Sequence, residues 1–231
     1  MRKQQQIWQD EHTDQGTLPR MANVRPASGV VAFIDYLKGC GVSLGGRAMD
    51  IGAGKGRNSI YLAGLGYEVW AFEYIQAAID TAKVLAAAND VVSAIHFECA
   101  DIDTRWDIPR DFFDIAIDSF SSIDIETKEG REMCRDEMYR TLKPGGYALV
   151  TVCSANDEWE KELIADHPGP EPNSTIWPQN GKFQKDYDKD ELRGFYKTFE
   201  VIELREISKQ TFKLGREGTA TNLWLALRKP A

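Results

Sequence analysis

The sequence predicts an α/β fold: a doubly wound sheet of seven strands, mostly parallel, that finishes in an antiparallel hairpin. Two observations predict the parallel part. Apolar strand segments alternate with helical patterns, and a glycine-rich turn directly follows the first strand. A third observation predicts the hairpin, because no helical pattern separates the last two strand segments. With 231 residues, of which 42% are apolar and 28% charged, the chain is expected to form one domain with a sizeable core.

The first half of the chain supplies three helices and three strands. Residues 1–25 are mostly polar, with Trp8 as a large apolar anchor. Beyond them, apolar spacing predicts helices over 27–37, 60–65 and 77–88 and strands over 48–51, 69–72 and 94–98. Gly39 and Gly41 are expected to stop the first of these helices.

The second half supplies four more strands. We expect strands over 112–117, 147–153, 199–207 and 222–227, and a helix over 126–142 that turns Met133, Met138 and Leu142 inward. Residues 208–221 carry no helical pattern. The last two strands therefore either pair antiparallel with each other, or the second inserts between existing strands.

Bulk properties exclude several classes of protein. The net charge of −8 argues against a basic nucleic-acid-binding face. The four scattered cysteines suit free thiols, with neither a disulfide framework nor a zinc site. No apolar run is long enough for a membrane helix, and the polar N-terminus is unlike a signal peptide, so a cytoplasmic location without membrane contact is expected. The sequence leaves the oligomeric state unknown.

The glycine turn can be tested against three kinds of ligand. It reads Asp50-x-Gly52-x-Gly54-x-Gly56. A dinucleotide fingerprint would need a third glycine where Arg57 stands, and a phosphate-binding P-loop would need Ser or Thr after its lysine. Asp50 would also repel a pyrophosphate. A cationic ligand requires neither pattern and would not be repelled by Asp50.

The stretch "MDIGAGKGRNSIYLAGLGYEVWAFE" (49–73) resembles the first two motifs of the class I S-adenosylmethionine-dependent methyltransferases. The resemblance continues in "CADI" (99–102), "FDIAIDSF" (113–120) and "LKPGGYALV" (142–150), and it covers residues 48–229 in order. It implies the Rossmann-like sheet of that family, with its terminal hairpin. Within the family, "GKGRNSIYLAGLGYEV" and "IDSF" look most like small-molecule and tellurite-resistance-type enzymes.

The resemblance also implies a cofactor site for S-adenosyl-L-methionine. Asp50 would lie near the methionine ammonium, Glu73 would hold the ribose hydroxyls, and Asp101 would meet the adenine amino group. The complete predicted set is Asp50, Gly52, Ala53, Gly54, Arg57, Asn58, Glu73, Tyr74, Asp101, Ile102 and Asp118. Simpler roles stay open: Glu73 as a solvated strand end, Asp118 as a turn or helix cap, and Arg57 and Asn58 as exposed residues of a first helical turn.

Under this interpretation the chain is one methyltransferase domain, residues 1–231. Its expected parts are an N-terminal cap and helix (1–47), a cofactor-binding half (48–153), a substrate-lid insert (154–187), and a C-terminal helix and hairpin (188–231). The insert is expected to be an irregular loop whose aromatic residues Trp177, Phe183 and Tyr187 line the pocket.

Three classes of function remain open on the sequence. The favoured class is transfer of a methyl group to an O, N or S atom of a small molecule. The alternatives are methylation of a protein or other macromolecule, and a cofactor-binding scaffold or dehydrogenase. Residues 118–121 lack the N/D-P-P-Y/F motif, which argues against methylation of base amines. Transfer from a sulfonium needs mainly positioning, so the sequence names no catalytic residue and no metal.

Overall fold

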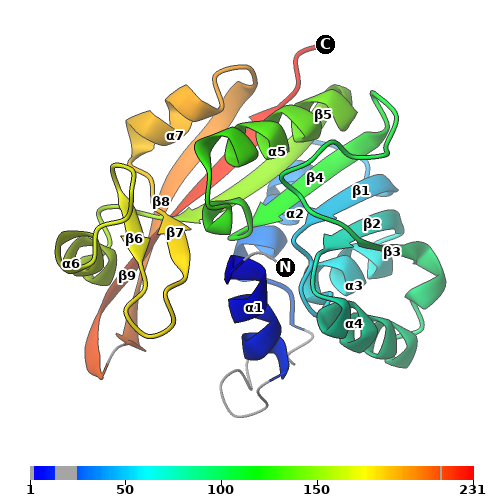
Figure 1. Cartoon of the computed structure of the whole chain (residues 1–231). Coiled ribbons are helices and arrows are strands. Elements are labelled where there is room, and N and C mark those ends of the chain that lie inside the picture. The colour runs from blue at the N-terminus through cyan, green and yellow to red at the C-terminus, as the bar shows by residue number, and fades with distance from the viewer. Residues whose placement is uncertain (1–2, 14–24, 214) are drawn as a thin grey trace.

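The central sheet of the computed structural model has seven strands (Figure 1). In spatial order they are β3 (Ile95–Cys99), β2 (Tyr67–Glu73), β1 (Gly46–Ile51), β4 (Phe113–Ser119), β5 (Leu142–Cys153), β9 (Arg216–Arg228) and β8 (Glu200–Lys213). The first five pair in parallel, and β9 runs antiparallel to both of its neighbours. The structure describes residues 3–13, 25–213 and 215–231. The predicted fold class is confirmed.

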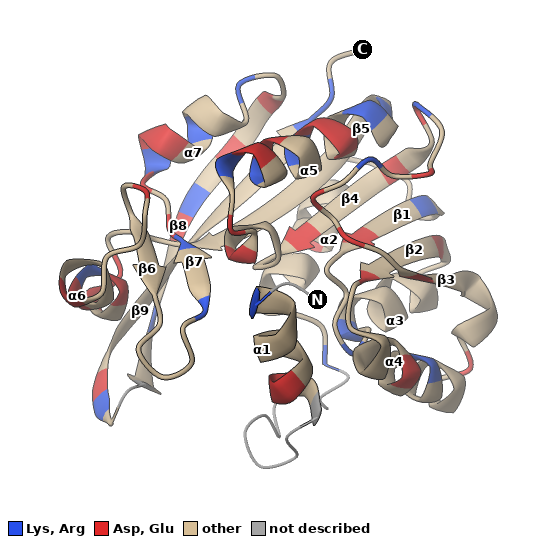
Figure 2. Ribbon diagram, viewed as in Figure 1, with Lys and Arg blue, Asp and Glu red and all other residues tan. Residues whose placement is uncertain are grey.

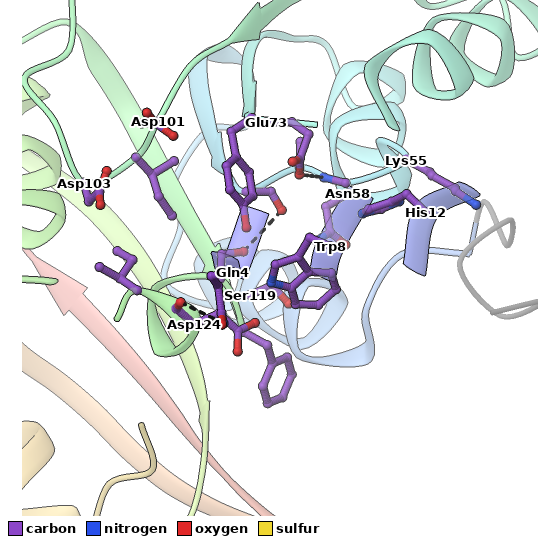
Figure 3. Close-up of a pocket in the computed structure, with 18 of the residues that line it drawn as sticks. Gln4, Trp8, His12, Lys55, Asn58, Glu73, Asp101, Asp103, Ser119 and Asp124 are labelled. Carbon is purple, nitrogen blue, oxygen red and sulfur yellow. Dashed lines mark hydrogen bonds between the residues drawn. The ribbon is translucent and has the colours of Figure 1, made fainter. Parts of the chain in front are cut away.

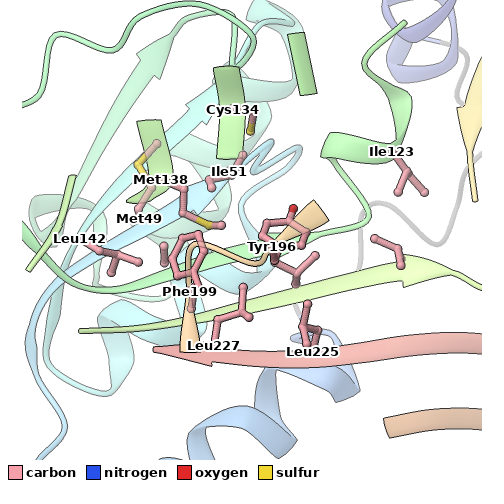
Figure 4. Close-up of a cluster of buried hydrophobic side chains, with 14 of the residues drawn as sticks. Met49, Ile51, Ile123, Cys134, Met138, Leu142, Tyr196, Phe199, Leu225 and Leu227 are labelled. Atoms are coloured by element: carbon pink, nitrogen blue, oxygen red, sulfur yellow. The ribbon is translucent and has the colours of Figure 1, made fainter. Parts of the chain in front are cut away.

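Helices cover both faces of this sheet. Helices α2 (Ser28–Gly39), α3 (Arg57–Gly64) and α4 (Gln76–Ala88) share one apolar cluster with strand residues such as Ala48 and Trp224. Helices α5 (Lys128–Thr141) and α7 (Lys189–Phe195) share the other cluster with Met49 and Ile51. Successive strand residues point to opposite faces, so Ala48 and Met49 enter different clusters. Figure 4 shows members of the second cluster, with Phe199 between Met138 and Leu227.

One predicted core residue is on the surface. Met138 and Leu142 are buried as expected, but the prediction for Met133 is wrong, because its side chain is 40% exposed. Met133 and Met138 are five positions apart, which is roughly 140° around a helix of 3.6 residues per turn. Cys134, one turn before Met138, takes the inward position instead.

The C-terminal strands resolve the alternative that the sequence left open. β9 both inserts between β5 and β8 and pairs antiparallel with each of them. The hairpin is longer than expected, because ladder pairs continue through Ser208 and Thr221 to Lys213 and Arg216. Residues 208–213 therefore extend strand β8, where the sequence suggested a loop.

Two segments outside the sheet differ from the sequence-based expectation. The insert is not an irregular loop, since it contains helix α6 (Glu158–Asp166) and a two-stranded ribbon of β6 (Ser174–Ile176) and β7 (Phe183–Lys185). The polar N-terminus contains a helix, α1 (Lys3–Thr13). Figure 1 shows α1 between this ribbon and α4, below the ends of the central strands.

Two short 3₁₀ segments, η2 (Val92–Ala94) and η3 (Ser122–Asp124), complete the described elements. Figure 2 shows that acidic and basic residues alternate along the ribbons of α5 and α7. Within the described ranges, no helix has both the length and the apolar character needed to cross a membrane.

Candidate cofactor and substrate pocket

A cavity of about 330 Å³ opens at the carboxyl ends of β1, β2 and β4. The chain order of the sheet reverses between β1 and β4, and such a reversal is where doubly wound sheets bind ligands. Nine of the predicted residues line the cavity: Gly52, Ala53, Gly54, Arg57, Asn58, Glu73, Tyr74, Asp101 and Ile102. Asp50 and Asp118 do not. The volume is in the range of small-molecule sites.

The glycine turn brings main chain to the cavity wall. Gly52 has a φ of 66°, and a Cβ there would lie 2.4 Å from the Ser121 hydroxyl oxygen. Gly54 has a φ of 55°, but a Cβ there would meet nothing within 4 Å. Gly52 is therefore required by close packing as well as by conformation, whereas Gly54 leaves open space at the wall where a ligand can approach.

Glu73 links the end of β2 to this turn. Its side chain is only 6% exposed, which rules out a solvated strand end. One carboxylate oxygen accepts a hydrogen bond from the Gly54 amide at 2.9 Å, and the other accepts from the Ile75 amide at 2.9 Å. Burial raises the pKa of Glu73, although these hydrogen bonds oppose the shift. The carboxylate thus holds the turn and at the same time faces the cavity (Figure 3).

Asp50 and Asp118 lie behind the wall and bond to the protein. The Asp50 carboxylate accepts from the Ser59 hydroxyl at 2.5 Å, and burial raises the pKa of Asp50 to about 6. Asp118 accepts from the Ser121 and Ser122 amides at 3.0 and 3.1 Å, and burial raises its pKa as well. Asp118 thus has the turn-capping role that the sequence left open. A cofactor contact by either carboxylate stays a prediction.

The start of α3 supplies the positive side of the cavity. Arg57 is the first residue of α3, and both Lys55 and Arg57 line the cavity. Asn58 also lines it and accepts a hydrogen bond from the Ala27 amide at 3.0 Å, which fixes the start of α2. Two cations beside a helix N-terminus favour an anionic ligand group such as a carboxylate.

The opposite end of the cavity carries acidic and apolar groups. Tyr74 follows β2, while Asp101 and Ile102 lie in the loop after β3, in the segment predicted to hold adenine. The indole N–H of Trp106 donates to the Ile102 carbonyl at 3.2 Å, and the Trp106 ring packs edge-on against Phe72. This loop is therefore anchored to the core.

Helix α1 forms a wall that no motif predicted. Gln4, Trp8 and His12 all line the cavity (Figure 3). Their helix is polar and lacks an apolar face, so only Trp8 gave a signal in the sequence. Burial is the main cause that lowers the pKa of His12 to about 4.

Residues following β4 were also missed. Phe120, Ser121, Asp124, Ile125 and Glu126 line the cavity, as does Ser119 at the end of the strand. Their position just after the carboxyl end of a strand is the signal that could have found them. Phe120 has a φ of 63°, an uncommon conformation for a bulky residue, which marks this turn as structurally constrained.

None of the residues of the insert lines the cavity. Phe183 and Tyr187 are buried in packing contacts, so the expectation that they line the pocket is wrong. Within the described ranges there is also no cluster of His, Cys, Asp and Glu side chains that could hold a metal ion.

Comparisons with known proteins agree with this geometry. The family described as methyltransferase domain matches residues 48–146. A probable S-adenosyl-L-methionine-dependent methyltransferase, TehB of Haemophilus influenzae, is 24% identical over 183 residues, or 78% of this chain and 55% of that protein. The chain spans about half the length of the curated relatives it matches.

Two solved structures share the fold. A methyltransferase of Methanosarcina mazei superposes with a TM-score of 0.71 at 20% identity, covering 84% of this chain and 97% of that one. The second is the 1,6-didemethyltoxoflavin-N1-methyltransferase of Burkholderia thailandensis, which was solved with 1,6-didemethyltoxoflavin and S-adenosylhomocysteine. It superposes with a TM-score of 0.67 at 14% identity, covering 99% of this chain and 88% of that one.

Proposed function

We propose that this chain, which belongs to the class I S-adenosylmethionine-dependent methyltransferase family, binds S-adenosylmethionine in the cavity and transfers its methyl group to a small molecule. One observation carries the proposal. Glu73 is a buried carboxylate that faces the cavity and is bonded to the Gly54 amide, beside an open stretch of glycine backbone. A ligand with vicinal hydroxyls can use a carboxylate in that position.

The residues present fit the proposed cofactor. Glu73 would accept from the ribose hydroxyls, and Asp101 with Ile102 would meet the adenine. Arg57 and Lys55 would attract the carboxylate of the methionine part. The bound cofactor would supply an activated methyl group on a sulfonium, so the protein has mainly to hold the acceptor in line with it and to exclude water.

A small acceptor is supported by how the cavity is covered. Helix α1 lies across it, and the Gln4 side chain fixes α1 to β7 through hydrogen bonds with the Phe183 main chain, both of 2.9 Å. Acidic and basic residues are mixed on α5 and α7, as Figure 2 shows. The toxoflavin enzyme, which shares the fold, is named for methylation of a small heterocycle. We propose no nucleic-acid partner and no membrane contact.

The test combines binding with turnover. Calorimetry should detect S-adenosylmethionine and S-adenosylhomocysteine in the micromolar range and should detect no NAD. Incubation with the methyl-labelled cofactor and a panel of metabolites should then give a labelled small molecule. Label that appears only in added protein or RNA would support the macromolecular alternative, and tight binding of NAD alone would reject the proposal.

A further inference from the structure

Asp124 is an acidic residue at the end of the cavity away from the predicted adenine and ribose contacts. It ends η3, directly after β4, and lines the cavity together with the apolar side chains of Trp8, Phe120 and Ile125. Figure 3 shows Asp124 next to Gln4 of α1 and separated from Glu73 and Asp101. The Gln4 amide donates to the main-chain carbonyl of Asp124 at 3.2 Å, so the position of Asp124 is tied to the helix that covers the cavity.

The half-buried Asp124 carboxylate differs from three buried carboxylates of the site. Asp50, Glu73 and Asp118 each accept hydrogen bonds from protein donors. Across the described ranges, the Asp124 side chain accepts no hydrogen bond from the protein, and the bonds of this residue are made by its main chain: its N–H donates to the Ser121 carbonyl and its carbonyl accepts from Gln4. Of these four carboxylates, Asp124 is therefore the one best placed to accept a proton or hydrogen bond from a ligand.

The charged neighbours of Asp124 come from three elements. Lys182, just before β7, favours its ionised form, whereas Glu11 of α1 and Asp118 of β4 disfavour it. The Lys182 ammonium also interacts with two groups of α1, since it lies 3.8 Å from the Glu11 carboxylate and 4.0 Å from the centre of the Trp8 ring. Burial is the largest effect and raises the pKa of Asp124 to about 7. A general base works best when its pKa lies near the operating pH.

We propose that Asp124 is the general base of the transfer, and that the acceptor is a neutral, planar molecule whose nucleophilic atom is a hydroxyl oxygen or a ring N–H nitrogen. This inference rests on the proposed function. The acceptor atom forms a bond to the methyl carbon, the carbon–sulfur bond breaks with its electron pair remaining on sulfur, and the acceptor's proton passes to the Asp124 carboxylate. The products are the methylated acceptor and S-adenosylhomocysteine.

The walls around Asp124 define this class of acceptor. Trp8 and Phe120 offer aromatic surface for a flat molecule. Asp124 and Glu126 repel an anion such as an inorganic oxyanion, whereas a neutral X–H group gains a hydrogen-bond acceptor. A nucleophile that is already ionised in solution has no proton to give and so gains nothing from Asp124.

That difference gives the experiment, with naphthol and naphthalenethiol as probes of the same shape. Naphthol keeps its proton near neutral pH, whereas much of the thiol is ionised. In Asp124→Asn, methylation of naphthol should fall by about 100-fold or more, while methylation of naphthalenethiol should stay the same or rise, because its thiolate needs no base and no longer meets the charge of Asp124. Asp124→Glu should restore part of the naphthol rate. Asp136→Asn, whose parent side chain is 60% exposed on α5, should behave as wild type.

A second readout does not depend on turnover. With S-adenosylhomocysteine bound, naphthol should bind wild type more tightly as pH rises from about 6 to about 8, because the ionised Asp124 is the hydrogen-bond acceptor. This pH dependence should vanish in Asp124→Asn. If that variant fails to fold, as judged by lost affinity for S-adenosylmethionine, the wild-type binding profile decides instead.

The outcomes separate this inference from the proposed function. The role of Asp124 is overturned if Asp124→Asn loses methylation of both probes equally or loses methylation of neither. It is also overturned if the affinity of wild type for naphthol does not change with pH. A wild-type enzyme that binds S-adenosylmethionine but methylates neither probe overturns the acceptor class and leaves the cofactor assignment standing. Absence of S-adenosylmethionine binding in wild type overturns both.

Discussion

Two carboxylates on neighbouring strands have different tasks in this protein. Glu73 faces the cavity and bonds to the main chain of the glycine turn, whereas Asp50 turns away and bonds to Ser59 at the start of α3. The sequence placed both beside the turn. Which way each side chain points depends on the donor within reach, which is the Ser59 hydroxyl for Asp50 and the Gly54 amide for Glu73.

Replacing Glu73 by Ala should weaken binding of S-adenosylmethionine by about 1–3 kcal/mol, because the ribose hydroxyls would lose a charged acceptor in a buried site. Calorimetry measures the change. Glu68→Ala is the matched control, since Glu68 lies on the same strand with its side chain 47% exposed and should leave the affinity unchanged. An unaltered dissociation constant in Glu73→Ala would limit Glu73 to shaping the turn.

Asp50 should make the free energy of unfolding depend on pH. Its folded pKa of about 6 lies above its unfolded value of about 4, so the folded state binds the proton more tightly. Stability is therefore highest below about pH 4, falls as pH rises towards about 6, and changes no further above that range. A shift of about two units corresponds to about 3 kcal/mol.

Asp50→Asn removes this titration while keeping an acceptor for Ser59. Urea unfolding of both proteins at several pH values between about 4 and about 7 should show that the variant gains stability relative to wild type across the interval. The difference between the two proteins isolates Asp50 from the other buried acids. Parallel curves would mean that the pKa of Asp50 is not raised.

At the scale of elements, α1 illustrates how a polar helix can be held in place. Side-chain hydrogen bonds, the ion pair of Glu11 with Lys182 and the contact of Lys182 with the Trp8 ring dock it. Gln4, 4% exposed, bonds to both main-chain groups of Phe183, and Asn180 donates to Glu11 at 2.7 Å. The predicted lid therefore has two parts with different positions: α1 lines the cavity, and the ribbon of β6 and β7 supports α1 from behind.

Gln4→Ala should loosen α1 without unfolding the sheet. It removes three hydrogen bonds and leaves the Phe183 N–H and C=O without partners, at a cost of about 1–3 kcal/mol. Hydrogen exchange of residues 3–13 should then accelerate about tenfold or more, since each 1.4 kcal/mol is a factor of ten. Gln6→Ala is the control, because Gln6 is exposed and bonds only within the helix, to Asp10. Equal exchange rates in wild type and Gln4→Ala would show that other contacts hold α1.

At the scale of the whole molecule, the cavity lies where the chain order of the sheet reverses, so a bound ligand can contact the loops after four strands, β1, β2, β3 and β4. A ligand that binds only the folded chain stabilises it by mass action. At 100 times its dissociation constant, S-adenosylmethionine should add about 2.7 kcal/mol. For a chain of this size, that corresponds to a rise in Tm of about 5–10 °C.

Thermal unfolding with S-adenosylmethionine, S-adenosylhomocysteine and NAD at equal concentrations measures this effect. The first two should raise the Tm and NAD should leave it unchanged, because Arg57 stands where a dinucleotide site needs a glycine. A rise with NAD alone would contradict the cofactor assignment.

The sequence by itself determined the parts of this protein that depend on local chemistry. Strand periodicity, the left-handed turn at Gly52 and Gly54, and an acidic residue at the end of β2 are properties of neighbouring residues, so the Rossmann-like half and nine residues of the pocket lining could be predicted. The missing helix between the last strands predicted the hairpin for the same reason.

Only the tertiary structure decided which distant groups meet. Gln4 pairs with a residue 179 positions away, β9 enters the sheet beside β5, and Asp124 reaches the cavity from a turn with no motif of its own. The Asp118 carboxylate accepts hydrogen bonds from the Ser121 and Ser122 amides and does not line the cavity. The reason is related, because a buried carboxylate must be paired with whichever donors the packing places beside it. Such partners are set by the packing of the whole chain, and no local pattern of residues specifies them.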